Sequence, residues 1–187
     1  MVGLQKKKIS VAVIFVLSVA MLLGSCKEPI GGTGKAPVFL VVENPQPYLV
    51  SCDVYKPAVT GHVSDDTKTV TIKSVLKSTT IPVNTFSDVI IQEYRVNYFR
   101  SDGNPNVPEP FFELGNHTVP VGGAASLEIL IVRAEAKLKA PLVSLAFGGG
   151  EGSIMMNAVV EFFGEDLSGN AVSGSVVIPI TAKDFPG

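Results

Sequence analysis

The sequence contains no tryptophan and only two histidines among its 187 residues. His62 and His117 cannot form a zinc site on their own, and the metal-binding patterns CxxC and HExxH are absent. The GxSxG turn that presents a nucleophilic serine in many hydrolases is missing as well. The sequence therefore predicts no catalytic residue, no bound metal and no other cofactor, and it favours a protein that is not an enzyme.

Basic residues are few and unevenly placed. The chain has 15 Lys and Arg residues against 17 Asp and Glu residues. Three of the lysines, Lys6 to Lys8, fall in the first 25 residues, which hold no acidic residue, so residues 26–187 keep 12 basic residues and a net charge of −5. Because a nucleic-acid binder needs a clustered excess of Lys and Arg, we expect no nucleic-acid partner.

One predominantly apolar run of 15 residues extends from Ile9 to Leu23, and no second run of that length follows it. As a helix this run would be about 22 Å long at ~1.5 Å per residue, short of the roughly 30 Å hydrocarbon core of a membrane. It follows Lys6 to Lys8 and precedes the small residues Gly24 and Ser25, which is the order of a cleaved export signal. The sequence thus predicts a signal peptide over residues 1–25, whose helix is removed.

The residues at the predicted cleavage point carry a more specific pattern. Leu23, Gly24, Ser25 and Cys26 together resemble the lipobox of bacterial lipoproteins. The resemblance implies cleavage between Ser25 and Cys26, a diacylglycerol on the Cys26 thiol, and an acyl chain such as palmitate on the new amino group. Several chains on one residue would hold the protein firmly at a membrane, since one chain alone binds only marginally. The alternative is an ordinary signal peptide with an incidental cysteine.

The residues after Cys26 indicate where and how the protein is held. By analogy with lipoprotein sorting in two-membrane bacteria, Lys27, where an Asp would retain the protein, implies transfer to the outer membrane of the cell envelope. Whether the periplasmic or the surface face is occupied is left open. Residues 26–36 contain three glycines and a proline without apolar periodicity, which is typical of a flexible tether. We expect one folded domain over residues 37–187.

The folded part consists of short β-rich segments separated by Gly, Pro, Asn and Asp. Alternating apolar and polar residues predict strands with one buried face, most clearly at 69–76, 89–99 and 119–132. Further strands are expected at 38–42 and 49–55, and a closing hairpin at 154–164 and 172–182, joined by EDLSGN. Pro179 within the last arm indicates an edge position or a bulge. Residues 133–140 are interpreted as a strand continuation or a crossover.

About seven strands without helical alternation predict an all-β, antiparallel β-sandwich. The pattern VPxGG at 119–123 and the hairpin pattern FxGxDxxGxxVSxS at 162–175 resemble immunoglobulin-like or fibronectin-III-like domains of uncharacterised exported bacterial lipoproteins. The resemblance covers residues 84–187 and implies a fold, not an activity, because such sandwiches host many functions. The chain lacks the tryptophan and the cysteine pair of antibody-type domains, so a different two-sheet topology stays open.

Cys52 is the one thiol left once Cys26 is lipidated, so it has no cysteine in the domain to pair with. The simplest interpretation is a small buried apolar side chain between Leu49 and Val54. A free reactive thiol, or a disulfide between two copies of the chain, is the alternative.

The oxygen-bearing residues Asp166, Ser168 and Asn170 alternate in the way that a weak calcium site would require. Calcium prefers six to eight oxygens, and the later bidentate glutamate of an EF-hand is missing. A hairpin turn explains the same three residues with fewer assumptions.

The segment from Ser101 to His117 is expected to be a long loop, because three prolines interrupt it and Gly115 and Asn116 follow. Phe111 and Phe112 stand directly after the prolines and could anchor a partner on a pre-ordered backbone. The alternative is that they cap an open end of the sandwich.

The leading functional hypothesis is therefore a lipid-anchored envelope protein that binds or scaffolds another envelope component through this loop or an exposed edge strand. A periplasmic small-ligand carrier is the second hypothesis, and a hydrolase with an unrecognised site is the third.

Overall fold

A computed structural model describes residues 35–55, 63–80, 82 and 84–185 of the chain. The predicted signal peptide, the cleavage residues Ser25 and Cys26, and most of the tether lie outside this range, as does His62. Among the described residues, no helix is long and apolar enough to cross a membrane.

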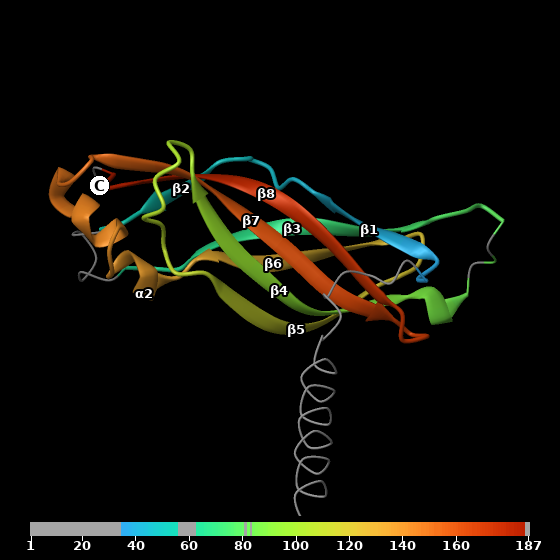
Figure 1. The fold of residues 1–187 in the computed structure, drawn as a ribbon. Helices are drawn as coiled ribbons and strands as arrows, with labels where there is room; N and C mark the ends of the chain where they lie inside the picture. Colours follow the sequence, from blue (N-terminus) through green and yellow to red (C-terminus); the bar gives the residue numbers. More distant parts are fainter. Residues whose placement is uncertain (1–34, 56–62, 81, 83, 186–187) are drawn as a thin grey trace, which may run out of the picture. The chain divides into compact units, whose positions relative to one another are not determined.

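The described domain is a sandwich of two β-sheets, as predicted (Figure 1). One sheet has three strands in the antiparallel order β1 (Val38–Glu43), β3 (Asp66–Leu76) and β6 (Ala124–Val132). The other has five strands in the order β2 (Val50–Asp53), β8 (Ala171–Lys183), β7 (Ser153–Asp166), β4 (Val89–Arg100) and β5 (Phe111–Val119). All pairs in the second sheet are antiparallel except β2 with β8, which is parallel.

The topology resembles that of immunoglobulin sandwiches. The order β8-β7-β4-β5 corresponds to the G-F-C order extended by the extra strand found in variable-type domains. The position of the first strand of an immunoglobulin domain is shared by two strands here: β1 belongs to the three-stranded sheet and β2 to the five-stranded sheet. The described residues form eight strands, one more than the seven or so expected, because β5 lies in a segment that was expected to be a loop.

The core lies between the sheets and follows the alternation in the sequence. Strand β7 shows this most plainly, since its even-numbered residues from Ile154 to Asp166 are all buried, and Ile154, Met156, Ala158, Val160 and Phe162 supply apolar side chains. The partner strand β8 contributes Val172, Val176, Ile178 and Ile180 from its buried face. The opposite faces of both strands hold the polar and half-exposed residues, as a one-sided sheet requires.

The prediction of a loop over 101–117 is wrong in its second half. Residues 101–110 are irregular, but β5 begins at Phe111 and pairs with β4 up to Val119. The pattern is hard to recognise in the sequence because the register shifts where Gly115 and Asn116 face the bulged Gln92. His117, expected in a loop, is an exposed residue of this strand.

Residues 133–140 form the crossover between the sheets, so strand continuation is ruled out. The short helix α2 (Ala134–Lys137) follows β6 directly, and the backbone N–H of Ala134 donates to Asp65 Oδ1 at 2.6 Å. A 3-10 segment, η3 (Leu142–Gly148), completes the connection to β7. The side chain of Asp65, far away in sequence, therefore supports the start of this helix.

Pro179 occupies a local edge of the sheet, as its missing N–H requires. It lies opposite Asn157 of β7 with no shift of register, so no bulge is present there. Pairing of β8 with β2 begins one residue later, at Ile180.

Candidate functional site

A groove of about 610 Å³ lies between the proline-rich loop and the crossover. Its apolar wall consists of Pro108, Pro110, Phe111 and Phe112, and its charged rim includes Arg133 and Lys139. The two Phe residues singled out in the sequence thus lie beside a surface hollow. The crossover forms its opposite wall.

Phe111 and Phe112 open β5 and point to opposite faces of the sheet. Phe111 lies across from the buried Val96 and is half-buried against the core. Phe112 lies across from Arg95 and keeps 58% of its surface exposed. Phe111 therefore serves both as part of the core and as groove wall, whereas Phe112 is available to a partner.

Arg133 is the central charged residue of the groove. Its guanidinium lies over the Phe111 ring, 4.2 Å from the ring centroid. Its Nη2 donates to Glu113 Oε1 at 2.8 Å and to the Phe112 carbonyl oxygen at 3.4 Å, and Glu135 lies 3.6 Å from Nη1. Stacking and ion pairing together fix this side chain between β5 and the crossover.

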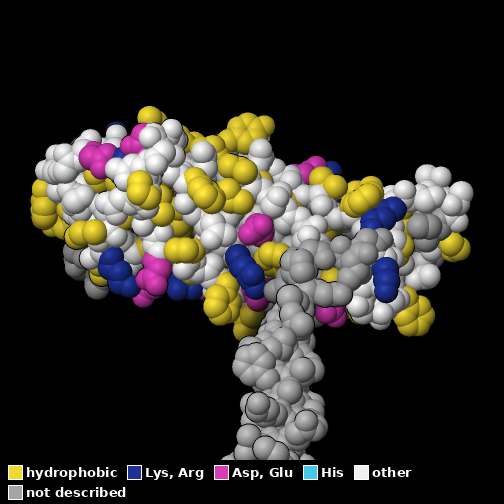
Figure 2. All heavy atoms as spheres, viewed as in Figure 1, with side chains coloured by type: hydrophobic (Ala, Val, Ile, Leu, Met, Phe, Trp, Pro, Cys, Tyr) yellow, Lys and Arg dark blue, Asp and Glu magenta, His cyan; other side chains and the backbone are white. Residues whose placement is uncertain are grey.

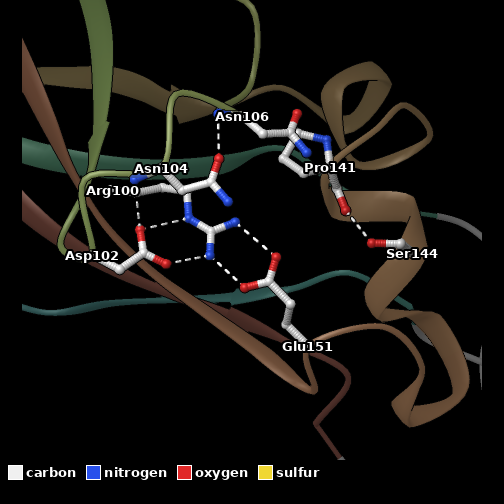
Figure 3. Close-up of polar contacts among 7 residues, drawn as sticks. All are labelled: Arg100, Asp102, Asn104, Asn106, Pro141, Ser144 and Glu151. Atoms are coloured by element: carbon white, nitrogen blue, oxygen red, sulfur yellow. Dashed lines mark hydrogen bonds and ion pairs between the residues drawn. The ribbon is translucent and has the colours of Figure 1, made fainter.

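The buried side chain of Arg100 fixes the start of the proline-rich loop through its contacts with two carboxylates (Figure 3). Arg100 ends β4, and its side chain is only 2% exposed. Its Nε and Nη2 donate to Asp102 at 3.0 and 2.5 Å, and Nη1 donates to Glu151 Oε1 at 3.0 Å, with a second contact from Nη2 to Glu151 Oε2. The guanidinium lowers the pKa of both carboxyl groups below their ordinary values, chiefly through these hydrogen bonds.

Asparagine and aspartate turns order the loop between this clamp and the groove. The N–H of Asn104 donates to Asp102 Oδ1 at 3.0 Å, and the N–H of Asn106 donates to Asn104 Oδ1 at 2.9 Å (Figure 3). In the crossover beyond the opposite wall, Ser144 Oγ donates to the Pro141 carbonyl oxygen at 2.6 Å. Hydrogen bonds within the chain therefore hold the loop and the crossover on the two sides of the groove.

Strand β5 also presents an exposed edge next to the groove. Within the described part of the chain, β5 pairs on one side only, with β4. Phe112 and Leu114 project from the outer face of this strand, and Leu114 is 75% exposed. Long, exposed, apolar edge strands are ready-made sites for pairing with another chain.

Cys52 is fully buried, which confirms the structural interpretation of this residue and rules out an exposed thiol. Burial raises the pKa of the thiol well above its ordinary value, and the nearby Asp66 carboxylate raises it further. Asp66 Oδ1 in turn accepts a hydrogen bond from the Lys137 ammonium at 2.9 Å. A disulfide between copies of the chain through Cys52 would require the core to open.

The residues of the suspected calcium site form a hairpin turn. Asp166 is buried, and its Oδ1 accepts hydrogen bonds from the N–H groups of Ser168 and Asn170 at 2.9 and 2.8 Å. The Asn170 side-chain amide also contacts both oxygens of this carboxylate. The carboxylate thus organises the turn. Across the described ranges, no three His, Cys, Asp or Glu residues gather as metal ligands would.

Three residues were not identified from the sequence: Arg133, which lines the groove, and Arg100 and Glu151, which hold the loop beside it. Arg100 and Glu151 are 51 residues apart and meet because β4 pairs with β7, which begins two residues after Glu151. The one hint in the sequence is Asp102, an acid two residues from the arginine in a turn-forming segment.

No protein-family model matches this chain, and a comparison with curated proteins finds no match.

Proposed function

We propose that this chain is a lipid-anchored cell-envelope protein whose sandwich domain binds another envelope protein along β5 and the adjoining groove. The observation that carries the binding proposal is the exposed edge of β5, with Phe112 and Leu114 on its surface, next to a groove whose walls are already ordered. Pre-ordered walls favour binding, because little conformational entropy is lost when a partner docks.

The anchor is supported by the sequence. The signal-like segment 1–25 and the lipobox-like residues up to Cys26 support lipidation of Cys26, and Lys27 supports an outer-membrane location. Whether the domain lies on the periplasmic or the surface face of that membrane would be known once the partner and its location are identified. Anchoring two proteins to one membrane raises their effective concentration, so a modest interface is enough for stable association.

The proposed binding mode is the addition of a strand to the sheet. An extended segment of the partner would pair with the backbone of β5, and its end would enter the groove between Pro110 and the crossover. Main-chain pairing supplies affinity in this mode, and the exposed Phe112 and Leu114 side chains supply selectivity. One edge carbonyl, that of Phe112, is already contacted by Arg133, so the partner strand would have to accommodate or displace that guanidinium.

Crosslinking in intact cells, followed by affinity purification of the full chain, tests this proposal. We expect one envelope protein in near-stoichiometric amount, and we expect its loss in the double variant Phe112→Ala/Leu114→Ala. The matched control is Met155→Ala/Val177→Ala, which removes two other exposed apolar side chains, from β7 and β8. A Cys26→Ser version shows whether capture needs the anchor. Equal capture by both double variants would contradict a binding role for β5.

The size of the groove supports a second candidate, a carrier of a small ligand. A volume of about 610 Å³ falls within the range of small-molecule pockets, roughly 300 to 1,000 Å³. In that case the purified protein should melt at a higher temperature with one member of a metabolite panel, and Phe111→Ala should abolish the shift. No change across the panel would leave the protein-binding proposal as the better one.

A further inference from the structure

The position at which the chain joins the domain indicates which end lies near the anchor. Pro37 accepts a hydrogen bond from the N–H of Lys77, just past the end of β3, and Val38 pairs with Leu76. A small cavity of about 210 Å³ is lined by Ala36 and Val38 together with residues 171–173 at the start of β8. The tether therefore leads to the end of the sandwich that carries the β7–β8 turn.

Further contacts connect this turn to the short 3-10 segment η2 (Thr85–Ser87). The N–H of Leu167 donates to the Asp88 carbonyl oxygen at 3.0 Å, and Ser168 Oγ lies 3.4 Å from the Phe86 carbonyl oxygen. Asp88 Oδ1 also accepts the N–H of Val121, so three connections meet here. We call the unit formed by residues 85–88, which are η2 and Asp88, and the turn 166–170 the tip.

The tip exposes apolar side chains. Phe86 is 66% exposed and Leu167 is 48% exposed, although the backbone beneath both residues is hydrogen-bonded. Two acids of the tip have oxygens engaged in its own structure, because Asp88 accepts from Val121 and Asp166 accepts from the turn. Glu165 is exposed on the strand below.

Positive charge borders the same end. Lys35 is exposed where the chain joins the domain, and the Lys77 ammonium lies over the exposed Phe39 ring, 5.0 Å from the centroid. Figure 2 shows Lys or Arg side chains next to hydrophobic ones at the end where β1 begins. Exposed aromatic and apolar groups together with lysine are what the interface of an anionic membrane attracts.

The length of the tether supports contact with the membrane. Ten residues separate Cys26 from Pro37, and a linker of that length has a root-mean-square span of roughly 18 Å. The headgroup layers add only about 10 to 15 Å to a hydrocarbon core of ~30 Å, so a lipid on Cys26 holds this end of the domain close to the headgroups.

We propose that the tip lies in the headgroup region of the membrane that holds Cys26, with Phe86 and Leu167 in contact with lipid. This inference rests on the lipid anchor of the proposed function. It orients the domain so that β1 starts at the membrane, whereas the groove beside Arg133 and Pro110 points away from it, toward a partner. The contact adds a second attachment to the lipid chains and limits rotation of the domain on its tether.

The absence of tryptophan provides a direct test, since one substitution creates a single tryptophan, whose emission can be excited apart from that of the four tyrosines. The full lipidated chain carrying Phe86→Trp is reconstituted into vesicles of phosphatidylethanolamine and phosphatidylglycerol, 3:1, with or without brominated acyl chains. We expect a blue-shifted emission and a loss of fluorescence with the brominated lipids. The matched control is Phe99→Trp, a 58% exposed position at the far end of β4, which should respond only to a quencher in the water.

Flotation of the same vesicles separates the two proposals. If the lipidated chain floats, the Cys26→Ser chain does not, and the Phe86→Trp fluorescence is unchanged by brominated lipids, then the contact is wrong and the anchor stands. If the full chain does not float, both are wrong. Equal quenching at positions 86 and 99 would show a domain lying flat and would overturn the proposed orientation. Leu167→Trp repeats the test if Phe86→Trp lowers the melting temperature.

Discussion

Gly164 of β7 faces the backbone of Ile90 on β4 so closely that a β-carbon on Gly164 would lie 2.2 Å from the Ile90 carbonyl oxygen. The approach occurs at the bulge of β4, where the register shifts between Ile91 and Glu93. We expect Gly164→Ala to destabilise the protein by about 1 to 3 kcal/mol, because the obstructing atoms are backbone and the strand must move. Urea denaturation should show this as a lower midpoint with an unchanged slope.

Gly115→Ala is the matched control for that prediction. A β-carbon there would meet the side chain of the exposed His117 at 3.1 Å, and that ring can turn away into solvent. The change in stability should stay within about 0.5 kcal/mol, as for other surface substitutions. Equal urea midpoints for the two glycine variants would show that a β-carbon at the close approach of β4 and β7 does not lower the free energy of unfolding.

The buried pair of Lys137 and Asp66 leads to a second prediction. The Lys137 side chain is 1% exposed, and its ammonium forms an ion pair with Asp66 Oδ1 at 2.9 Å. Asp66→Ala would leave a buried ammonium without that partner, so we expect a loss of about 3 to 5 kcal/mol in unfolding free energy. The double variant Asp66→Ala/Lys137→Met removes the charge as well and should recover part of the loss. A double variant less stable than Asp66→Ala in urea denaturation would contradict this account.

A buried thiol and a buried phenol predict that the protein loses stability at alkaline pH. Burial raises the pKa of Cys52 and of Tyr98, and the Tyr98 hydroxyl donates to the Ile131 carbonyl oxygen at 2.6 Å. In the unfolded chain the thiol ionises near pH 8.5 and the phenol near pH 10. Above those values the unfolded state binds fewer protons than the native state, so stability falls as pH rises, by up to ~1.4 kcal/mol per pH unit for each group.

Urea midpoints between pH 7 and pH 11 measure that slope, in a Cys26→Ser background so that a single thiol titrates. We expect Cys52→Ala to abolish the decline that begins near pH 8.5 and to leave the later decline from tyrosine. Parallel pH profiles for the two proteins between pH 8.5 and 10 would show that the Cys52 thiol does not differ between the folded and unfolded states.

Most of the sandwich could be predicted from the sequence, because apolar and polar residues alternate along a strand that buries one face. The strand around Ile72 and the closing hairpin from Ile154 to Ala182 bury one face each, and their residues alternate accordingly. Strand β5 was missed because it is an edge strand with a bulge: Gly115 and Asn116 interrupt the alternation, and Leu114 faces water. Its identity as a strand depends on pairing with β4, which lies outside the segment itself.

The groove could be predicted only in part. Phe111 and Phe112 stand directly after the prolines in the sequence, and in the structure they line the groove, but they lie on a strand and not in the expected loop. The opposite wall depends on Asp65 supporting the start of α2, a contact across 69 residues. The Arg100 clamp similarly depends on sheet register. Such long-range polar contacts leave no periodic pattern, so a single sequence does not indicate them.

The clamp around Arg100 predicts how the loop beside the groove behaves. Replacing Arg100 with leucine removes the donor shared by Asp102 and Glu151, and the two carboxylates then repel each other across the loop. The amides of Asn104 and Asn106, which depend on that arrangement, should exchange hydrogen faster, whereas amides in the centre of β7 should not change.

In the unaltered protein the amides of Asn104 and Asn106 should lose protection as pH falls, because the guanidinium lowers the pKa of both carboxyl groups and protonation breaks the contacts. The effect should begin at a pH below the ordinary carboxyl range near 4. Exchange rates at Asn104 and Asn106 that are the same in both proteins would show that the asparagine turns hold the loop without the arginine, and the groove would then owe its order to the prolines alone.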